Sequence, residues 1–213
     1  MASNEKLTAA SNTPKEMRYT VLPERMPAIP PEKMSEAQRK AVADLVATRG
    51  ALKGPFMAIM RCPDLMDRIQ RMGEYIRYKG ALDLRINRMA GLMMTRYWSN
   101  QYEWHGNTPY ALKAGLNPAI IEAIGEGRRP TSMADDEAIV HEFMTELLTN
   151  KSVSDPTYER AVAKFGEDGI IELLGIVGYY GMLAMIMNVV RTPVPDGNPL
   201  SLAPMPEQIR PIL

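Results

Sequence analysis

The densest group of residues that could take part in catalysis lies at positions 96–109, which read RYWSNQYEWHGNTP. Both tryptophans of the chain, Trp98 and Trp104, lie here with the carboxylate Glu103 and with His105, one of only two histidines. An aromatic-walled pocket that holds a carboxylate and an imidazole is suited to acid–base chemistry on a flat apolar substrate. The same groups could instead be ordinary caps and hydrogen-bonding partners at a helix end.

Helical spacing separates the candidate groups of this stretch. On one continuous helix Glu103 and Asn107 share a face because they are four residues apart. His105 would then lie about 200° round the helix from Glu103. Three alternatives follow: the helix ends near Tyr102, His105 faces the site of a neighbouring subunit, or His105 has no catalytic role.

Motifs for several other chemistries are missing. The single cysteine, Cys62, cannot form an internal disulfide or a thiolate metal cage, and we expect it to be a small buried apolar residue. Two histidines also argue against a histidine-built metal site, and His141 is expected to be solvated. No glycine-rich phosphate loop follows a strand pattern. The sequence therefore predicts no metal and no cofactor.

Composition limits the class of protein and its partners. The chain has 213 residues, 25 basic and 25 acidic, and 46% apolar residues, which is enough for the core of one domain. The balanced charge gives no reason to expect nucleic acid or an anionic membrane as a partner. The first 20 residues contain no apolar run of the kind found in signal peptides, so we expect a cytoplasmic protein.

The uncharged segment 173–190, LLGIVGYYGMLAMIMNVV, is the one stretch that approaches transmembrane length. Asn188 interrupts it, and Tyr179 and Tyr180 lie at its middle rather than at an interface. Glycines recur every third residue at 175, 178 and 181, which would let another backbone approach closely. We interpret the segment as a central buried helix, with a possible role at a subunit contact, rather than as a membrane span.

The rest of the chain also has helical spacing and no convincing strand pattern, so the predicted class is all-α. Prolines are concentrated at the two ends, which predicts extended arms over 1–33 and 192–213 around one helical domain over 34–191. Between the arms, helical or apolar segments are expected over 36–48, 56–60, 63–79, 83–105, 109–114, 118–125, from a cap at 131 or 132 to 150, 155–165 and 173–190.

Short motifs over about residues 50–195 resemble the carboxymuconolactone decarboxylase family, which includes the alkylhydroperoxidase D-like proteins. They are YEWH at 102–105, Pro109 with ALKAGL at 111–116, GPF at 54–56, CPDL at 62–65, VSD at 153–155, FG at 165–166 and GYYG at 178–181. The resemblance depends on the order and spacing of these motifs together. The resemblance implies an all-helical bundle of the alkylhydroperoxidase D-like type that assembles into a homo-oligomer, for which we expect a trimer or hexamer.

The peroxidase branch of that family carries Glu, Cys, Cys and His at the positions of Arg88, Asn100, Glu103 and Asn107, and this chain differs at all four. A dithiol peroxidase needs a thiolate nucleophile and a resolving thiol. We therefore take thiol peroxidase activity to be excluded. The decarboxylase branch often carries Glu and His at positions 88 and 107, and this chain departs there too.

The resemblance therefore implies a cofactor-independent lyase that cleaves a carbon–carbon bond, for example by decarboxylation, in a lactone or aromatic-derived substrate of aromatic catabolism. The predicted catalytic residues are His105, Glu103 and Arg88, where Arg88 pairs with Glu103 or holds a substrate carboxylate or phenolate. The predicted substrate-binding residues are Asn107, Tyr102, Tyr180, Arg96 and Trp104. A proton-transfer isomerase and a non-catalytic ligand-binding or scaffold relative are the alternatives.

Overall fold

The computed structural model describes residues 23–195 and Leu202, and most of the two predicted arms lies outside these residues. Within them the protein is helical and contains no strand, so the all-α prediction is confirmed. The elements are a 3₁₀ turn, η1 (Pro31–Lys33), and the helices α1 (Glu36–Arg49), α2 (Phe56–Ile59), α3 (Pro63–Tyr78), α4 (Leu84–Tyr97), α5 (Gln101–Lys113), α6 (Pro118–Gly125), α7 (Asp135–Asn150) and α8 (Asp155–Val190).

Local signals in the sequence account for several helix ends. Ser35 and Gln38 form a reciprocal capping box at the start of α1, and Gly50 ends the helix in the left-handed conformation with φ of 78°. Pro63 is the first residue of α3, where its missing N–H costs nothing. The Asn117 side chain accepts a hydrogen bond from the N–H of Ala119 and so begins α6.

The prediction of one helix over 83–105 and a separate one from Pro109 is wrong. The chain leaves α4 at Ser99, whose φ is 48°, and the Asn100 side chain then caps α5. Helix α5 continues through Pro109, although a proline inside a helix removes one hydrogen bond. Ala111, two residues further on, is fully buried in a second apolar cluster, and this packing holds the last turn in place.

Two other helix boundaries also differ from expectation. Helix α7 begins at Asp135 rather than after Thr131 or Ser132, because the Glu137 carboxylate accepts the N–H of Ala134 at 2.7 Å. The sequence predicts a helix boundary at Gly166. In the structure Gly166 is a break inside α8, with φ of 72° and ψ of 170°.

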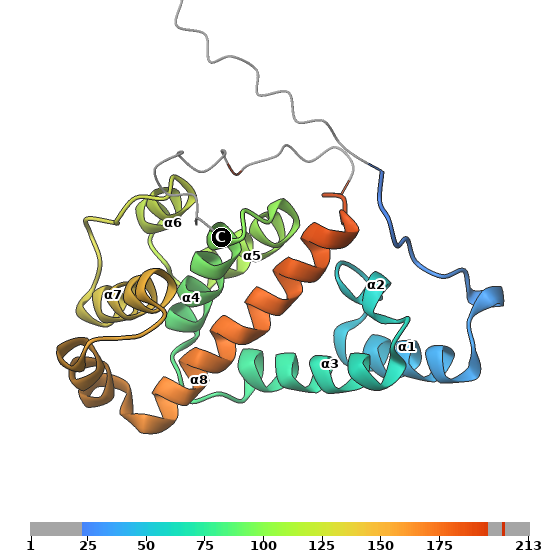
Figure 1. Ribbon diagram of the computed structural model, residues 1–213, viewed down its shortest axis with the longest axis horizontal. Coiled ribbons are helices and arrows are strands. Elements are labelled where there is room, and N and C mark those ends of the chain that lie inside the picture. Colours follow the sequence, from blue (N-terminus) through green and yellow to red (C-terminus); the bar gives the residue numbers. More distant parts are fainter. Residues whose placement is uncertain (1–22, 196–201, 203–213) are drawn as a thin grey trace, which may run out of the picture.

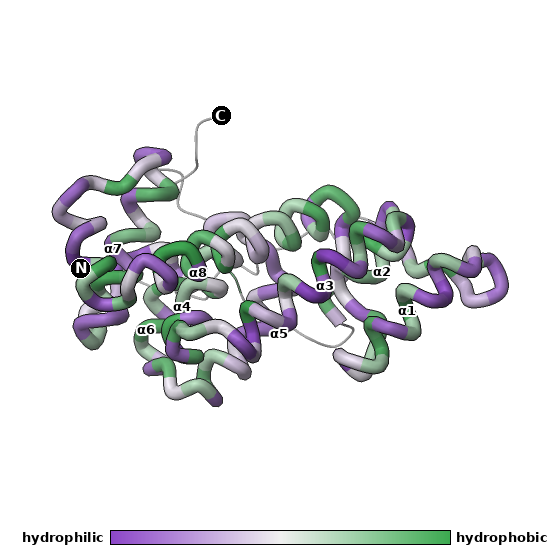
Figure 2. The backbone as a smooth tube through the Cα atoms, turned by 90° about the horizontal axis from the view of Figure 1, so that it is seen from below, coloured by the Kyte–Doolittle hydropathy of each residue, from purple (hydrophilic) through white to green (hydrophobic). Residues whose placement is uncertain are grey.

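Helix α8 passes diagonally through the molecule after Gly166, with α4 and α7 on one side and α3 on the other (Figure 1). Figure 2 shows hydrophobic residues along this helix in the middle of the molecule. It is the one helix of the described chain that is long and apolar enough to cross a membrane, and half of its most apolar window is buried inside the protein. A core helix of a globular fold has these same properties, which agrees with the predicted central helix.

Close packing between α3 and α8 depends on Gly73. A Cβ atom at this position would lie 2.1 Å from the hydroxyl oxygen of Tyr179. Of the three α8 glycines at which a close approach was predicted, only Gly181 has a described neighbour close to its Cβ position. Gly181 meets Met94, but nothing in the described chain lies within 4 Å of a Cβ at Gly175 or Gly178.

Two single-residue expectations are wrong. Cys62 is exposed, because it is the residue just before α3 rather than part of the buried face of a helix. His141 is buried rather than solvated, because its side of α7 packs into the protein. Burial lowers the pKa of His141, and the nearby charge of Arg129 lowers it further.

Candidate active site

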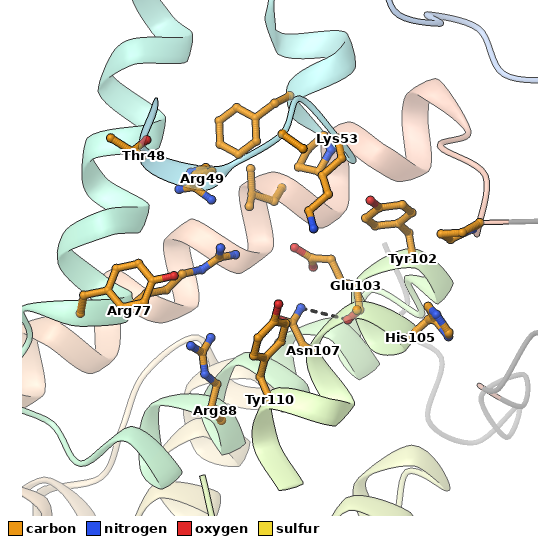
Figure 3. A pocket seen from close by; sticks show the side chains of 17 residues that line it. Thr48, Arg49, Lys53, Arg77, Arg88, Tyr102, Glu103, His105, Asn107 and Tyr110 are labelled. Carbon is orange, nitrogen blue, oxygen red and sulfur yellow. Dashed lines mark hydrogen bonds between the residues drawn. The ribbon is translucent and has the colours of Figure 1, made fainter. Parts of the chain in front are cut away.

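A cavity of about 410 Å³ lies where α1, α3, α4 and α5 meet beside α8 (Figure 3). Its walls contain Phe56 and Leu183 as apolar contacts and a large set of polar side chains. The polar lining residues are Thr48, Arg49, Lys53, Arg77, Tyr78, Arg88, Tyr102, Glu103, His105, Asn107 and Tyr110. This volume lies within the range of sites that take small organic ligands.

Glu103 carries the only carboxyl group among the described residues that line this cavity. It lies in the first turn of α5, its residue is 5% exposed, and its Oε2 atom has no hydrogen-bond partner among the described residues. Burial raises the pKa of Glu103 to about 8, and the opposing effects of Arg77 and of a hydrogen bond from Thr95 are smaller. Glu103 therefore keeps its proton at neutral pH.

Asn100, the N-cap residue of α5, and Asn188, on α8, fix the position of Glu103. The Asn100 Oδ1 atom accepts the N–H of Glu103 at 2.8 Å, and its Nδ2 atom donates to Asn188 Oδ1 at 2.8 Å. Asn188 in turn donates to the carbonyl of Trp98 at 2.8 Å. The start of α5, and with it the direction of the Glu103 side chain, is therefore tied to α8.

Arg88 approaches the cavity from α4 and is 7% exposed. Its Nη1 atom lies 3.3 Å from the hydroxyl of Tyr180, and its guanidinium lies 5.6 Å from the centre of the Tyr110 ring. Its Nε atom has no partner among the described residues. The predicted pair between Arg88 and Glu103 does not form: both line the cavity, but no ion pair joins them in the described chain.

Two further arginines, which sequence reasoning missed, come from the N-terminal helices. Arg49, the last residue of α1, lies 3.3 Å from the Tyr179 hydroxyl and donates to the carbonyl of Gln70 at 3.2 Å. Burial acts to lower the pKa of Arg77, on α3, but Tyr180 and Tyr179 raise it above its ordinary value. A weak signal was available, because Gln70, Gly73 and Arg77 share one face of α3 at helical spacing.

The remaining predicted site residues differ in whether they line the cavity and in what they contact there. Asn107 lines the cavity one turn after Glu103 and donates to its carbonyl at 2.9 Å. Tyr102 lines the cavity against Gly54, and burial raises its pKa. His105 belongs to the lining, but its imidazole is directed away from the three arginines (Figure 3). Tyr180 is fully buried and touches the site through Arg88.

Trp104 and Arg96, both predicted to bind substrate, lie outside the cavity lining. Trp104 is rotated about 100° from Glu103 on α5, and it packs in the second apolar cluster, close to Gly125. Arg96 is eight residues from Arg88 on α4, which turns it about 80° away, and it is 3% exposed. Helical rotation therefore separates these two side chains from the groups that line the site.

The arrangement offers one proton-carrying acid opposite several fixed cations. No group of three His, Cys, Asp or Glu side chains that could hold a metal ion occurs in the part of the chain that the structure describes. Acid–base chemistry on an anionic ligand is the reaction type that these side chains can support by themselves.

Comparison with solved structures identifies the fold. An uncharacterised peroxidase-related protein from Ralstonia eutropha JMP134, described as an alkylhydroperoxidase AhpD core, matches with a TM-score of 0.68 at 12% identity. The match covers 84% of this chain and 95% of that one. A protein of unknown function from Agrobacterium tumefaciens, described as a candidate AhpD antioxidant defence protein, matches with a TM-score of 0.58 at 14% identity and covers 67% of this chain and 99% of that one.

These likenesses show that the chain has the alkylhydroperoxidase D-like fold, as the sequence resemblance implied. No family model matches the sequence. No curated protein matches it either. At such low sequence identity, the solved structures establish the fold of this chain but not its activity.

Proposed function

We propose that this chain, which is built on the alkylhydroperoxidase D-like fold, is a cofactor-independent carbon–carbon lyase of the cytoplasm. Its substrate would be a lactone or an aromatic-derived acid, as encountered in aromatic catabolism. The observation that carries the proposal is the buried carboxyl group of Glu103, which faces a ligand-sized cavity and has a pKa of about 8. One of its oxygens has no hydrogen-bond partner within the described part of the chain.

The reaction divides into bond cleavage and proton transfer. When the carbon–carbon bond to a carboxylate breaks, carbon dioxide leaves and the electron pair moves into a conjugated carbonyl or ring of the substrate itself. The protonated Glu103 then donates its proton to the resulting carbanion, and its carboxylate regains a proton from water. No electron acceptor from outside the substrate is needed.

The arginines have a defined role in such a reaction. A cation stabilises the transition state only if it faces an atom that gains negative charge. An arginine that held the departing carboxylate would stabilise the ground state instead, because that group loses its charge. We therefore expect Arg77 or Arg88 to contact the oxygen that receives the electron pair, and the other cations to hold a carboxylate that is retained.

The alternatives use the same site. A proton-transfer isomerase would use Glu103 as base and acid in turn, without loss of carbon dioxide. A non-catalytic ligand-binding relative would bind the acid and release it unchanged. The Glu103 oxygen that has no hydrogen-bond partner among the described residues favours catalysis, because a buried group with a perturbed pKa in a cavity is typical of a catalytic acid.

The direct test is a screen of aromatic acids and lactones for release of carbon dioxide or formaldehyde. We expect turnover by the protein after dialysis against a chelator and without any thiol reductant. Arg71→Gln is the control variant and should turn over the same substrates as the wild type, because Arg71 is an exposed arginine of α3 that pairs with Asp67 outside the cavity lining. Loss of turnover on chelation that one metal restores would contradict cofactor independence.

A further inference from the structure

We propose that Arg49, Arg77 and Arg88 form a binding site for a small, doubly charged oxyanion, and that a ligand occupies this site only while Glu103 holds its proton. This site deepens the proposed function. The identification of the bound anion with the substrate rests on that proposed function, whereas the anion site itself does not. Arg49 and Arg77 lie outside the motif positions that carried the family resemblance.

The first argument is the absence of a counter-charge. None of the three arginines forms an ion pair with an acidic residue of the described chain. Their hydrogen-bond partners are neutral, namely the Tyr179 and Tyr180 hydroxyls and the Gln70 carbonyl. The Nε atoms of Arg77 and Arg88 are buried without a partner among the described residues. Arg88 is buried, and Arg49 and Arg77 are partly buried. Cations that are removed from water without a counter-charge are costly, so a ligand that supplies negative charge would be stabilised here.

The second argument is convergence. The three guanidinium groups come from α1, α3 and α4 and point into one cavity, on the side opposite Glu103 (Figure 3). Two adjacent tyrosines hold them there. Tyr179 binds Arg49, and Tyr180 binds Arg88 and contacts Arg77. Guanidinium groups donate in a planar fork that matches oxyanion geometry, and three of them favour a ligand with two negative charges over one with a single charge.

The third argument concerns Glu103. Arg77 is close enough to lower the pKa of Glu103, so the two groups are electrostatically coupled. The other basic side chains on the described lining are Arg49, Lys53, Arg88 and His105, and Glu103 is the one acidic group that faces them. An ionised Glu103 would neutralise part of the cationic cluster and repel an incoming anion. A protonated Glu103 does neither, and it can donate a hydrogen bond to the ligand. Anion binding and protonation of Glu103 therefore favour each other.

The test measures binding without turnover. Inorganic sulfate and succinate, which both stay doubly charged between pH 6.5 and 9, are titrated into the full chain by calorimetry at constant ionic strength, with acetate as the singly charged comparison. Because Glu103 loses its proton with a pKa of about 8, we expect both dianions to bind about tenfold more weakly at pH 9 than at pH 6.5. Acetate should bind at least about tenfold more weakly than succinate at pH 6.5.

Variants assign the effect to these residues. Arg77→Gln and Arg88→Gln should each weaken dianion binding by about tenfold or more, as expected for a lost charged hydrogen bond. Glu103→Gln should bind dianions at pH 6.5 as the wild type does and should lose the pH dependence. Arg71→Gln, the exposed control on the same helix as Arg77, should bind like the wild type. Circular dichroism melts confirm that each variant is folded.

Three results would overturn the proposal. They are equal dianion binding by the wild type and both cavity arginine variants, wild-type binding that does not change between pH 6.5 and 9, and acetate binding as tight as that of succinate. The wild-type titrations need no variant and so do not depend on folding of the mutants. Dianion binding without turnover of any acid would remove the lyase proposal and leave the anion site standing. Turnover of an acid by a protein that binds neither dianion would remove the anion site and leave the lyase proposal standing.

Discussion

A carboxyl group that keeps its proton at neutral pH is a ready general acid, and burial gives Glu103 this property. The carboxyl group of Glu103 would be ionised at pH 7 if it were exposed to water. In the protein it faces cations across the cavity and is still protonated, because loss of hydration outweighs the attraction of Arg77. This balance between desolvation and a neighbouring charge is what the proposed chemistry depends on.

Replacing Glu103 by Gln keeps the size and one hydrogen-bond donor but removes the proton that is transferred. We expect kcat on an accepted substrate to fall by about 100-fold or more with little change in the melting temperature. In the wild type, kcat should decline as the pH rises through about 8, because the acid form of Glu103 is lost above its pKa.

His105→Gln is the comparison on the same helix. Because the His105 imidazole is directed away from the three arginines (Figure 3), we expect kcat to stay within a few-fold of the wild type and the midpoint of the pH profile to stay unchanged. If His105→Gln lost activity as severely as Glu103→Gln, the imidazole would have to be part of the proton transfer.

Sequence reasoning could find part of this site, and the reason is local geometry. Glu103 and Asn107 share a helix face at a spacing of four residues, and the family resemblance pointed to position 88. Arg49 and Arg77 could not be assigned to the site in this way, because only the packing of α1 on α3 and of α3 on α8 brings them to the cavity. Trp104 was chosen for its chemistry, but its rotation on α5 directs it into a core cluster.

The elements were predictable where a helix carried its own start and stop signals. Ser35, Pro63 and Asn117 each mark a helix start that the structure confirms. The break between α4 and α5 was not predictable from periodicity, because apolar spacing continues across it and Ser99 adopts a positive φ without being glycine. Long-range bonds from Asn188 hold that break, and they exist only in the folded chain.

Packing between elements is most sensitive at Gly73, where α3 approaches α8. Gly73→Ala would place a methyl group 2.1 Å from the Tyr179 hydroxyl and 2.5 Å from an Arg49 nitrogen. We expect a loss of about 2 kcal/mol or more in the free energy of unfolding, measured by urea denaturation, and weaker anion binding.

Gly106→Ala on α5 is the control, because no atom of residues 23–195 or Leu202 lies within 4 Å of its Cβ position. Alanine has a higher helix propensity than glycine, so this variant should be up to about 1 kcal/mol more stable than the wild type. A Gly73→Ala protein as stable as Gly106→Ala would show that α3 and α8 do not depend on this contact.

At the scale of the whole molecule, α8 presents an apolar stripe to the outside. Ile171 is 68% exposed and Val189 is 60% exposed, and the stripe between them contains Leu174, Gly178 and Met185. These positions recur at spacings of three, four or seven residues, so they lie along one face of the helix. Gly175 and Gly178, whose Cβ positions no described residue approaches within 4 Å, lie in the apolar part of the same helix.

We therefore expect the chain to self-associate through this face of α8. The family resemblance implies that the assembly is a trimer or hexamer. Analytical ultracentrifugation at micromolar concentration should give a multiple of the 23.8 kDa chain mass. Leu174→Lys should lower that mass, and Glu159→Lys, a charge change at an exposed residue near the start of α8, should not. A wild-type protein that sediments at 23.8 kDa would contradict the prediction.

The central claim is that Glu103 is a neutral acid at neutral pH, and its titration can be observed directly. Carbon-13 NMR of protein labelled at the glutamate carboxyl carbons, compared with the same spectra of Glu103→Gln, identifies the Glu103 signal. We expect that signal to titrate with a pKa of about 8 in the ligand-free protein, and to move to a higher pKa when succinate is added. A Glu103 signal that titrates below about pH 5, like an ordinary solvated glutamate, would contradict the account.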